Sequence, residues 1–181
     1  MHSKAGYEYL LAYKITIPIY DYTVEFCHRW IDYKSRTKDQ MEQAARSGSV
    51  NVAEGSKEKS LAMYIKLVGV AAASQEELLK DYQSYARQHK IAIWDKTKAR
   101  EIGEVREIWE IMRNSPTLPD SPHFPNLPDS PEISVNLMIT LVNQANYLLQ
   151  KLATSLEEKH TREGGFNEKL LHARLQYRRT H

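Results

Sequence analysis

The sequence contains a single cysteine, Cys27, among its 181 residues. A lone cysteine excludes an internal disulfide and a metal site built from several thiolates, and it favours a reducing, cytoplasmic location. No run of about 18 apolar residues exists, so no membrane span is expected. The opening stretch, MHSKAGYEYLLAYK, has only short apolar pieces and does not have the pattern of a signal peptide.

Motifs that would indicate an enzyme are also missing. The seven glycines are too scattered for a phosphate-binding loop, and no spacing of His and Cys typical of a metal site occurs. Cys27 and His28 are neighbours, so on a helix their side chains point about 100° apart, which favours a core thiol over a nucleophile. Glu157, His160 and Glu163 share a helix face that is more typical of solvent exposure than of a cation site. We therefore expect no enzyme activity, no cofactor and no metal.

The composition that remains is typical of a folded domain. Apolar residues make up 41% and charged residues 27%, and the length is sufficient for one ordinary domain with its own core. The formal net charge is +2, with a pI near 8.5. That mild excess of positive charge permits nucleic-acid binding without predicting it.

Apolar residues recur three and four positions apart along most of the chain, which predicts helices. No segment alternates with a period of two for long enough to be a strand. Pro18 suits a first helical turn, Tyr33 continues the apolar face of that helix, and Thr37 is expected to cap the next one. The expected helices span residues 16–36, 39–55, 61–86, 97–113, 132–160 and 166–179.

The stretch RSGSVNVAEGSKEKS, residues 46–60, holds an unusual number of small residues. Gly48 costs about 1 kcal/mol in a helix interior relative to Ala, which suggests that a neighbouring backbone comes close there. Gly55 is expected to end the helix in the left-handed conformation. The following helix has its own small-residue segment, VGVAAAS, so we expect the two helices to cross closely.

Six of the seven prolines fall within residues 114–131. Such a density excludes a regular element and predicts either an ordered loop or an exposed linker. The chain therefore divides into residues 1–113, which hold the core helices, a Pro-rich loop at 114–131, and residues 132–181. This last part holds a long helix that completes the bundle and a C-terminal suffix helix. We favour that long helix over the 97–113 helix as the one that closes the bundle.

Positive charges gather in two places. Lys57 and Lys59 lie beside the start of a helix, where backbone N–H groups and two ammonium groups suit a phosphate, and Arg46 precedes them. Residues 151–181 hold seven Lys and Arg against four Glu. Both features are also typical of ordinary solvated surface, and the eleven tyrosines are more typical of packing than of base stacking. The candidate nucleic-acid-binding residues are Arg46, Lys57, Lys59, Arg174, Arg178 and Arg179.

Two stretches carry a resemblance to a known family. RTKDQMEQAARSGSVNVAEGS, residues 36–56, resembles the signature of the bacterial four-helix-bundle proteins encoded within intervening sequences of 23S ribosomal RNA genes. In that family a small-residue helix ends in Asn-Ile-Ala-Glu-Gly, and here the segment reads Asn51-Val52-Ala53-Glu54-Gly55. Residues 143–174, which run into Gly-Gly-Phe, resemble the suffix of one subgroup.

The resemblance implies an all-α, up-down antiparallel four-helix bundle with an extra helix, a Pro-rich loop and a helical suffix. It also implies a homopentamer and a relation to the accessory variability protein of diversity-generating retroelements. That protein binds a reverse transcriptase and nucleic acid during mutagenic complementary-DNA synthesis. The family motif implies no catalytic duty for Asn51, Glu54 and Gly55, and we expect Asn51 and Glu54 to form a buried polar pair near a tight crossing.

Two functions follow as hypotheses. The first is a non-enzymatic, oligomeric accessory protein that binds RNA or DNA and assists a reverse transcriptase, away from any membrane. The alternative is an oligomeric protein-interaction scaffold that binds no nucleic acid.

Overall fold

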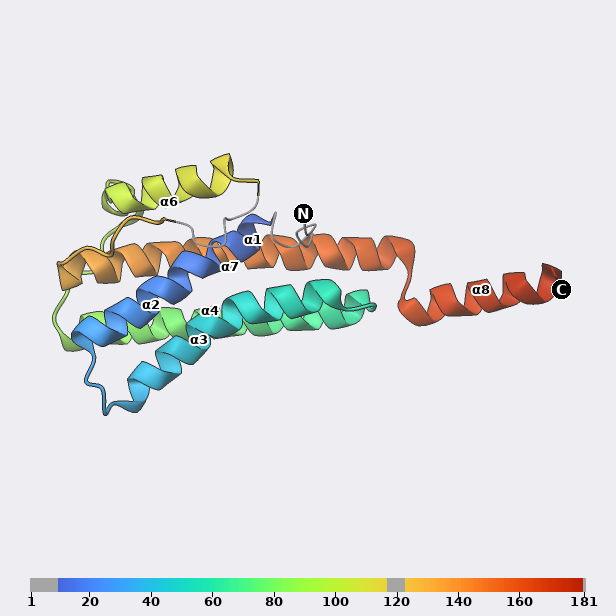
Figure 1. The fold of residues 1–181 in the computed structure, drawn as a ribbon, viewed down its shortest axis with the longest axis horizontal. Coiled ribbons are helices and arrows are strands. Elements are labelled where there is room, and N and C mark those ends of the chain that lie inside the picture. The colour runs from blue at the N-terminus through green and yellow to red at the C-terminus, as the bar shows by residue number, and fades with distance from the viewer. Residues whose placement is uncertain (1–9, 117–122, 181) are drawn as a thin grey trace.

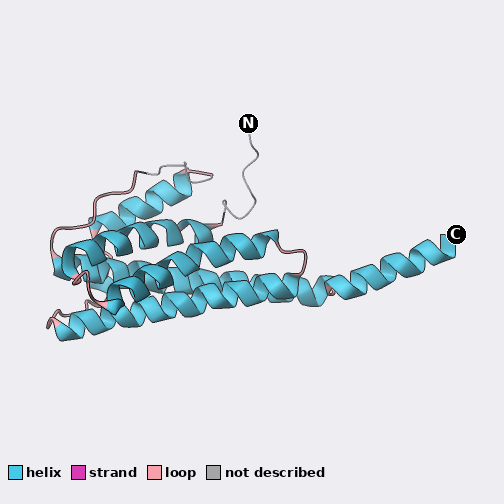
Figure 2. Ribbon diagram, turned by 60° about the horizontal axis from the view of Figure 1, so that its bottom comes forward, coloured by secondary structure: helices cyan, strands magenta, loops and turns pink. Residues whose placement is uncertain are grey.

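The computed structural model describes residues 10–116 and 123–180. Within these ranges the chain is helical and no strand occurs, which confirms the predicted all-α class (Figure 2). The helices are α1 (Leu11–Lys14), α2 (Thr16–Trp30), α3 (Arg36–Lys57), α4 (Leu61–Gln88), α5 (Lys96–Ala99), α6 (Gly103–Asn114), α7 (Pro131–Glu163) and α8 (Phe166–Thr180).

Four of these helices, α2, α3, α4 and α7, form an antiparallel up-down bundle (Figure 1). The favoured long helix, α7, therefore closes the bundle. Apolar residues three and four positions apart on α4 face inward, and its Leu78, Tyr82 and Ala86 are fully buried. The Tyr82 hydroxyl donates to Oγ1 of Thr23 at 3.0 Å, and the Phe26 ring packs edge-on against Tyr82 with ring centroids 5.0 Å apart. These contacts join α2 to α4 in the core.

The shorter α6 lies outside the bundle, beside α1 and α7. Its Ile108 and Met112 are buried, and Nε1 of Trp109 donates to Oε1 of Gln144 on α7 at 2.8 Å. The buried Lys14 on α1 donates to the carbonyl oxygens of Met112 and Ser115 at 3.1 and 2.6 Å. This places a cation against the negative end of the α6 dipole, and burial lowers the pKa of Lys14.

Several helix ends differ from the prediction. The first long helix ends at Trp30, and Tyr33 is 79% exposed instead of continuing its apolar face. An Asp32 turn explains the end, because the Asp32 carbonyl and carboxylate accept the N–H groups of Ser35 and Lys34. Ser35 caps α3 by accepting from the Thr37 N–H, so Thr37 is not the cap.

The predicted 97–113 helix is two helices. The Asp95 carboxylate accepts the N–H groups of Thr97 and Lys98, which starts α5 before the expected boundary. The α5 helix ends after one turn, and α6 begins at Gly103. In contrast, α7 begins at Pro131, one residue before the predicted start, and ends at Glu163, three residues beyond the predicted end; Gly164 follows it with a φ of +73°, which favours glycine.

The two glycines of the small-residue stretch make room for side chains of α4. A methyl group at Gly48 would overlap Nε2 of the buried Gln75, so the close neighbour is a side chain and not the expected backbone. Gly55 does not end α3, which continues to Lys57; a Cβ there would lie 2.5 Å from Cδ2 of Tyr64. The expected close crossing of the two small-residue segments is present, since Oγ of Ser74 donates to Oγ of Ser47 at 2.8 Å and Val68 and Ala71 of α4 are buried, while Gly69 faces open space.

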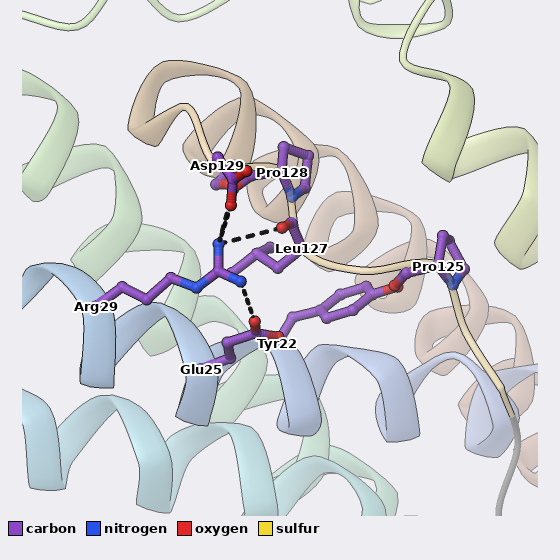
Figure 3. Close-up of polar contacts among 8 residues, drawn as sticks. Tyr22, Glu25, Arg29, Pro125, Leu127, Pro128 and Asp129 are labelled. Carbon is purple, nitrogen blue, oxygen red and sulfur yellow. Dashed lines mark hydrogen bonds and ion pairs between the residues drawn. The ribbon is translucent and has the colours of Figure 1, made fainter.

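Residues 123–130 of the Pro-rich segment form an ordered loop that crosses α2 (Figure 3), whereas Asn114 belongs to α6 and Pro131 to α7. The Tyr22 hydroxyl donates to the Pro125 carbonyl at 2.5 Å. The Arg29 guanidinium donates to the carbonyls of Leu127 and Pro128 and to the Asp129 carboxylate at 3.2–3.3 Å. Leu127 is only 1% exposed, so the loop contributes to the core. Residues 117–122 of the predicted loop lie outside the described part.

Candidate nucleic-acid interface

One end of the bundle combines the predicted basic regions. Figures 1 and 2 both show the α3–α4 turn and the joint between α7 and α8 at this same end, from which α8 projects. We call residues 54–66 and 151–180 the α8 end. It holds ten Lys and Arg against six Glu, a formal charge of +4, whereas the whole chain carries +2. The rest of the molecule is therefore net negative, and the positive charge is concentrated at the α8 end.

The α8 helix carries most of this excess. It contains four Lys and Arg and only one carboxylate, Glu168, and none of its residues is buried. Among the residues that the structure describes, no ion pair involves Arg174, Arg178 or Arg179. Their guanidinium groups are therefore available to phosphate oxygens.

The joint before α8 sets its direction. Gly164 ends α7 with its N–H bonded to the His160 carbonyl, and the Gly165 N–H donates to the Glu168 carboxylate at 3.0 Å. Lys169 then pairs with Glu163 at 3.2 Å across the joint, and this hydrogen bond lowers the pKa of Glu163. These local contacts direct α8 away from its own bundle, so the side chains of α8 are accessible.

The α3–α4 turn supplies Lys57 and Lys59, and both are exposed. Ser60 is the residue before α4, but its side chain does not cap the first turn. Arg46 is exposed on α3 eleven residues before Lys57, which is about 16 Å along the helix axis. The structure therefore places Lys57 and Lys59 at the same end as α8, whereas Arg46 does not join the patch as expected.

An aromatic residue that the sequence reasoning did not select also lies on α8. Tyr177 is 65% exposed and directly precedes Arg178 and Arg179. The segment LQYRR was the available signal, because an aromatic beside two arginines is a stacking platform next to phosphate contacts. By contrast, Tyr22 and Tyr82 are buried, in agreement with the packing that we favoured for the tyrosines.

The motif residues of α3, Asn51, Glu54 and Gly55, differ in burial and in their contacts. The Asn51 amide donates to the carbonyl and to Oγ of Ser47 at 2.9 and 2.8 Å, and Ser74 on α4 donates to the same Oγ at 2.8 Å. This chain of hydrogen bonds joins α3 to α4. Glu54 is exposed, so the expected buried pair of Asn51 and Glu54 is not formed. Gly55 is buried against Tyr64.

Cys27 and His28, the pair considered as a nucleophile and a base, have different environments. Cys27 is fully buried and burial raises its pKa to about 12, while His28 is exposed. Within residues 10–116 and 123–180, no group of three or more His, Cys, Asp and Glu side chains is placed to hold a metal ion. None of the described helices combines the length and the apolar character that crossing a membrane requires.

No protein-family model, curated protein or solved structure matches this chain.

Proposed function

We propose that this chain is a non-enzymatic, oligomeric protein that binds nucleic acid through its α8 end. The observation that carries the proposal is the separation of charge, with +4 at the α8 end of a chain whose total is +2. A polyanion approaching the molecule is attracted to that end and repelled by the rest, so the charge distribution selects the contact surface.

The geometry of α8 suits a nucleic-acid backbone. Arg174 and Arg178 lie about 40° apart on one side of α8, and Arg179 lies about 100° further around this helix, which stands clear of the bundle. Guanidinium groups bind phosphates through paired hydrogen bonds, and the Tyr177 ring offers a surface on which an unpaired base stacks. These contacts do not select a base sequence, so we expect broad binding to structured RNA or to single-stranded DNA.

The resemblance of residues 36–56 adds the class of partner. It supports an accessory role beside a reverse transcriptase of a diversity-generating retroelement, during mutagenic complementary-DNA synthesis. It also supports a five-chain assembly, whose mass by light scattering would be near five times 21.0 kDa. Co-purification of the protein with such a reverse transcriptase tests this part of the proposal separately from nucleic-acid binding.

Binding of a labelled structured RNA across a salt series tests the interface. The triple variant Arg174→Gln/Arg178→Gln/Arg179→Gln should bind more weakly, and its plot of log affinity against log salt should be flatter. Each phosphate contact contributes a slope of about 0.7–0.9, so the loss of three contacts should lower the slope by about 2–3. Measuring fluorescence anisotropy between low and physiological salt gives both quantities.

A matched control removes the same charge from the other end of the molecule. Lys96, Arg100 and Arg106 are exposed on or next to α5 and α6, and changing all three to Gln should leave the slope unchanged. Equal weakening by both triple variants would mean that only total charge matters and would refute the α8 interface. Wild-type binding that does not depend on salt, or no binding, would refute the function.

The alternative function, a protein-interaction scaffold, is favoured by a different observation on the same helix. Large apolar side chains of α8 are exposed, which is typical of a surface that contacts protein. A protein partner that is retained after nuclease treatment, together with no binding of RNA or DNA, would favour the scaffold.

A further inference from the structure

The α8 helix exposes more apolar surface than a solvated helix requires. Two rows of apolar side chains run along it. Phe166, Leu170, Ala173 and Tyr177 lie within about 40° on either side of one line along the helix. A second row, Leu171 and Leu175, lies about 140–180° around the helix from that line. All of these side chains are exposed, including Leu171 at 58%.

A helix of this kind needs a partner surface. Isolated helices shorter than about 12–15 residues are marginal in water, and α8 has 15 residues. The contacts of Gly165 with Glu168 and of Lys169 with Glu163 direct α8 away from its own bundle, and no other described element lies beside it in Figure 1 or Figure 2. The stabilising surface must therefore come from another molecule.

The chain itself presents a matching surface on α4. Its outward side carries Ala62, Met63, Gly69, Val70 and Ala73, which we call the outer stripe. Met63 and Val70 are 42% and 41% exposed, and nothing lies within 4 Å of where a Cβ of Gly69 would be. The aliphatic stem of Lys66 can lie along the same surface with its ammonium in water. The stripe is thus mostly apolar, and its Gly69 and Ala73 allow a second helix to approach closely there.

We propose that the Phe166–Tyr177 row of α8 docks, in parallel orientation, on the outer stripe of α4 in a second copy of this chain. The lengths agree, since the row and the stripe each extend about 16 Å at 1.5 Å per residue. In the register that places Phe166 beside Met63, Ala173 lies beside Val70. The small Ala173 then lies close to Gly69 and Ala73.

Charge selects this orientation. In the parallel register Arg178 lies near Glu77 of the other copy, and Glu76 extends the same acidic stretch of α4. The reversed orientation would place Arg178 and Arg179 near Lys59, whereas Lys169 lies within about one turn of Lys66 in both orientations and so does not distinguish them. Opposite charges at the edge of a helix pair favour association and set its direction, and like charges oppose it.

The same reasoning disfavours one other occupant. Pairing of α8 with α8 of another copy would bring together two helices that each carry a formal charge of +3. The inference rests on the oligomeric part of the proposed function and does not require nucleic-acid binding.

Light scattering on nuclease-treated protein tests the contact without nucleic acid. Val70→Lys and Leu170→Lys should each reduce the multi-chain mass of the wild type toward that of one chain. Each should also lower the helical circular dichroism, because an undocked α8 unfolds. Val24→Lys is the matched control, since Val24 is 38% exposed on α2 away from the stripe, and its mass should not change. A wild-type protein with the mass of a single chain, or an equal effect of all three changes, would overturn the proposal.

Disulfide trapping identifies the two surfaces directly. A mixture of Val70→Cys and Ala173→Cys chains should form a cross-linked dimer on oxidation, whereas neither variant alone should; the native Cys27 is buried in both. Cross-linking of Ala173→Cys with itself would indicate α8–α8 pairing. A one-chain cross-link in the doubly substituted Val70→Cys/Ala173→Cys protein would indicate docking within the chain. Either result would overturn the proposal.

These results are separable from the proposed function. An assembled protein that traps the α4–α8 disulfide but binds no RNA would retain this inference and remove the nucleic-acid interface. A single-chain protein with salt-dependent RNA binding would do the reverse.

Discussion

Replacing Gly48 by Ala should destabilise the bundle, although it removes a glycine from the interior of a helix. At a solvated site this change stabilises a helix by about 1 kcal/mol. At Gly48, however, the added methyl would overlap Nε2 of Gln75 and lie 3.0 Å from its Cδ. Gln75 is fully buried and its amide cannot turn into water. Overpacking of this kind costs about 1–3 kcal/mol, so we expect a net loss of up to about 2 kcal/mol.

A double-mutant cycle isolates this effect. In a Gln75→Ala background the obstructing amide is gone, and Gly48→Ala should then stabilise the protein by about 1 kcal/mol. The coupling free energy between the two positions should be about 1–3 kcal/mol. Urea unfolding followed by circular dichroism, at one protein concentration for all four proteins, gives the free energies of unfolding.

The critical result is the difference between the effect of Gly48→Ala in the wild type and its effect in Gln75→Ala. If Gly48→Ala changes the free energy of unfolding equally in the wild type and in Gln75→Ala, the two side chains do not compete for space. The explanation of the small-residue stretch as room for α4 side chains would then be wrong.

Two further predictions concern the loop and the buried acids. Arg29→Ala removes the guanidinium that donates to the Leu127 carbonyl, so thermolysin should cleave the 123–130 loop several-fold faster. Tyr33→Ala, a change at an exposed residue beyond α2, should leave the cleavage rate unchanged. Equal cleavage rates for both variants would contradict the proposed role of Arg29 in holding the loop. Burial raises the pKa of Cys27 to about 12 and also raises that of Tyr82. The folded state therefore holds protons that the unfolded chain releases above about pH 8.5–10, and stability should fall as pH rises, by up to about 1.4 kcal/mol per pH unit for each group. Urea midpoints between pH 8 and 10.5 measure this slope, which Cys27→Ala should reduce; a midpoint independent of pH would contradict it.

The fold could be predicted wherever local signals and long periodicity agree. The buried apolar faces of α4 and α7 each extend over several turns, and α7 has Pro131 at its start and Gly164 directly after its end. The predicted boundaries of the final helix also agree with α8. In these segments the helix propensity, the apolar spacing and the capping residues all indicate the same helix, so tertiary contacts do not change its boundaries much.

The predicted helix boundaries are wrong where a contact with a distant residue or a short turn determines the helix end. Gly55 has the usual residue type for a helix end, but the Tyr64 ring on α4 occupies the space that a Cβ would need, so the glycine is required inside the helix. Tyr33 fits the apolar spacing of α2, yet the Asp32 turn ends the helix before it. Neither the position of the Tyr64 ring nor the strength of the Asp32 turn can be read from spacing alone.

The candidate site was predictable in its residue types and not in its arrangement. The charges of Lys57, Lys59 and the α8 arginines are visible in the sequence, but their common location depends on the antiparallel order of α3, α4 and α7 (Figure 1). Arg46 is near Lys57 in sequence and about 16 Å from it along α3, because a helix separates residues that a turn would bring together. The exposure of Tyr177 depends on the joint that directs α8 outward.

Residues 46–60 therefore concern packing, while the proposed binding surface lies largely elsewhere. Within residues 46–60, Gly48 and Gly55 face side chains of α4, and Asn51 bonds within its own helix. Substitutions at these positions should change the free energy of unfolding and leave the salt dependence of RNA binding alone. The α8 arginines should behave in the opposite way, because they contact nothing in the core whose loss would unfold the bundle. The fold and the proposed function thus depend on different residues, and the function has to be tested on the helix that stands outside the bundle.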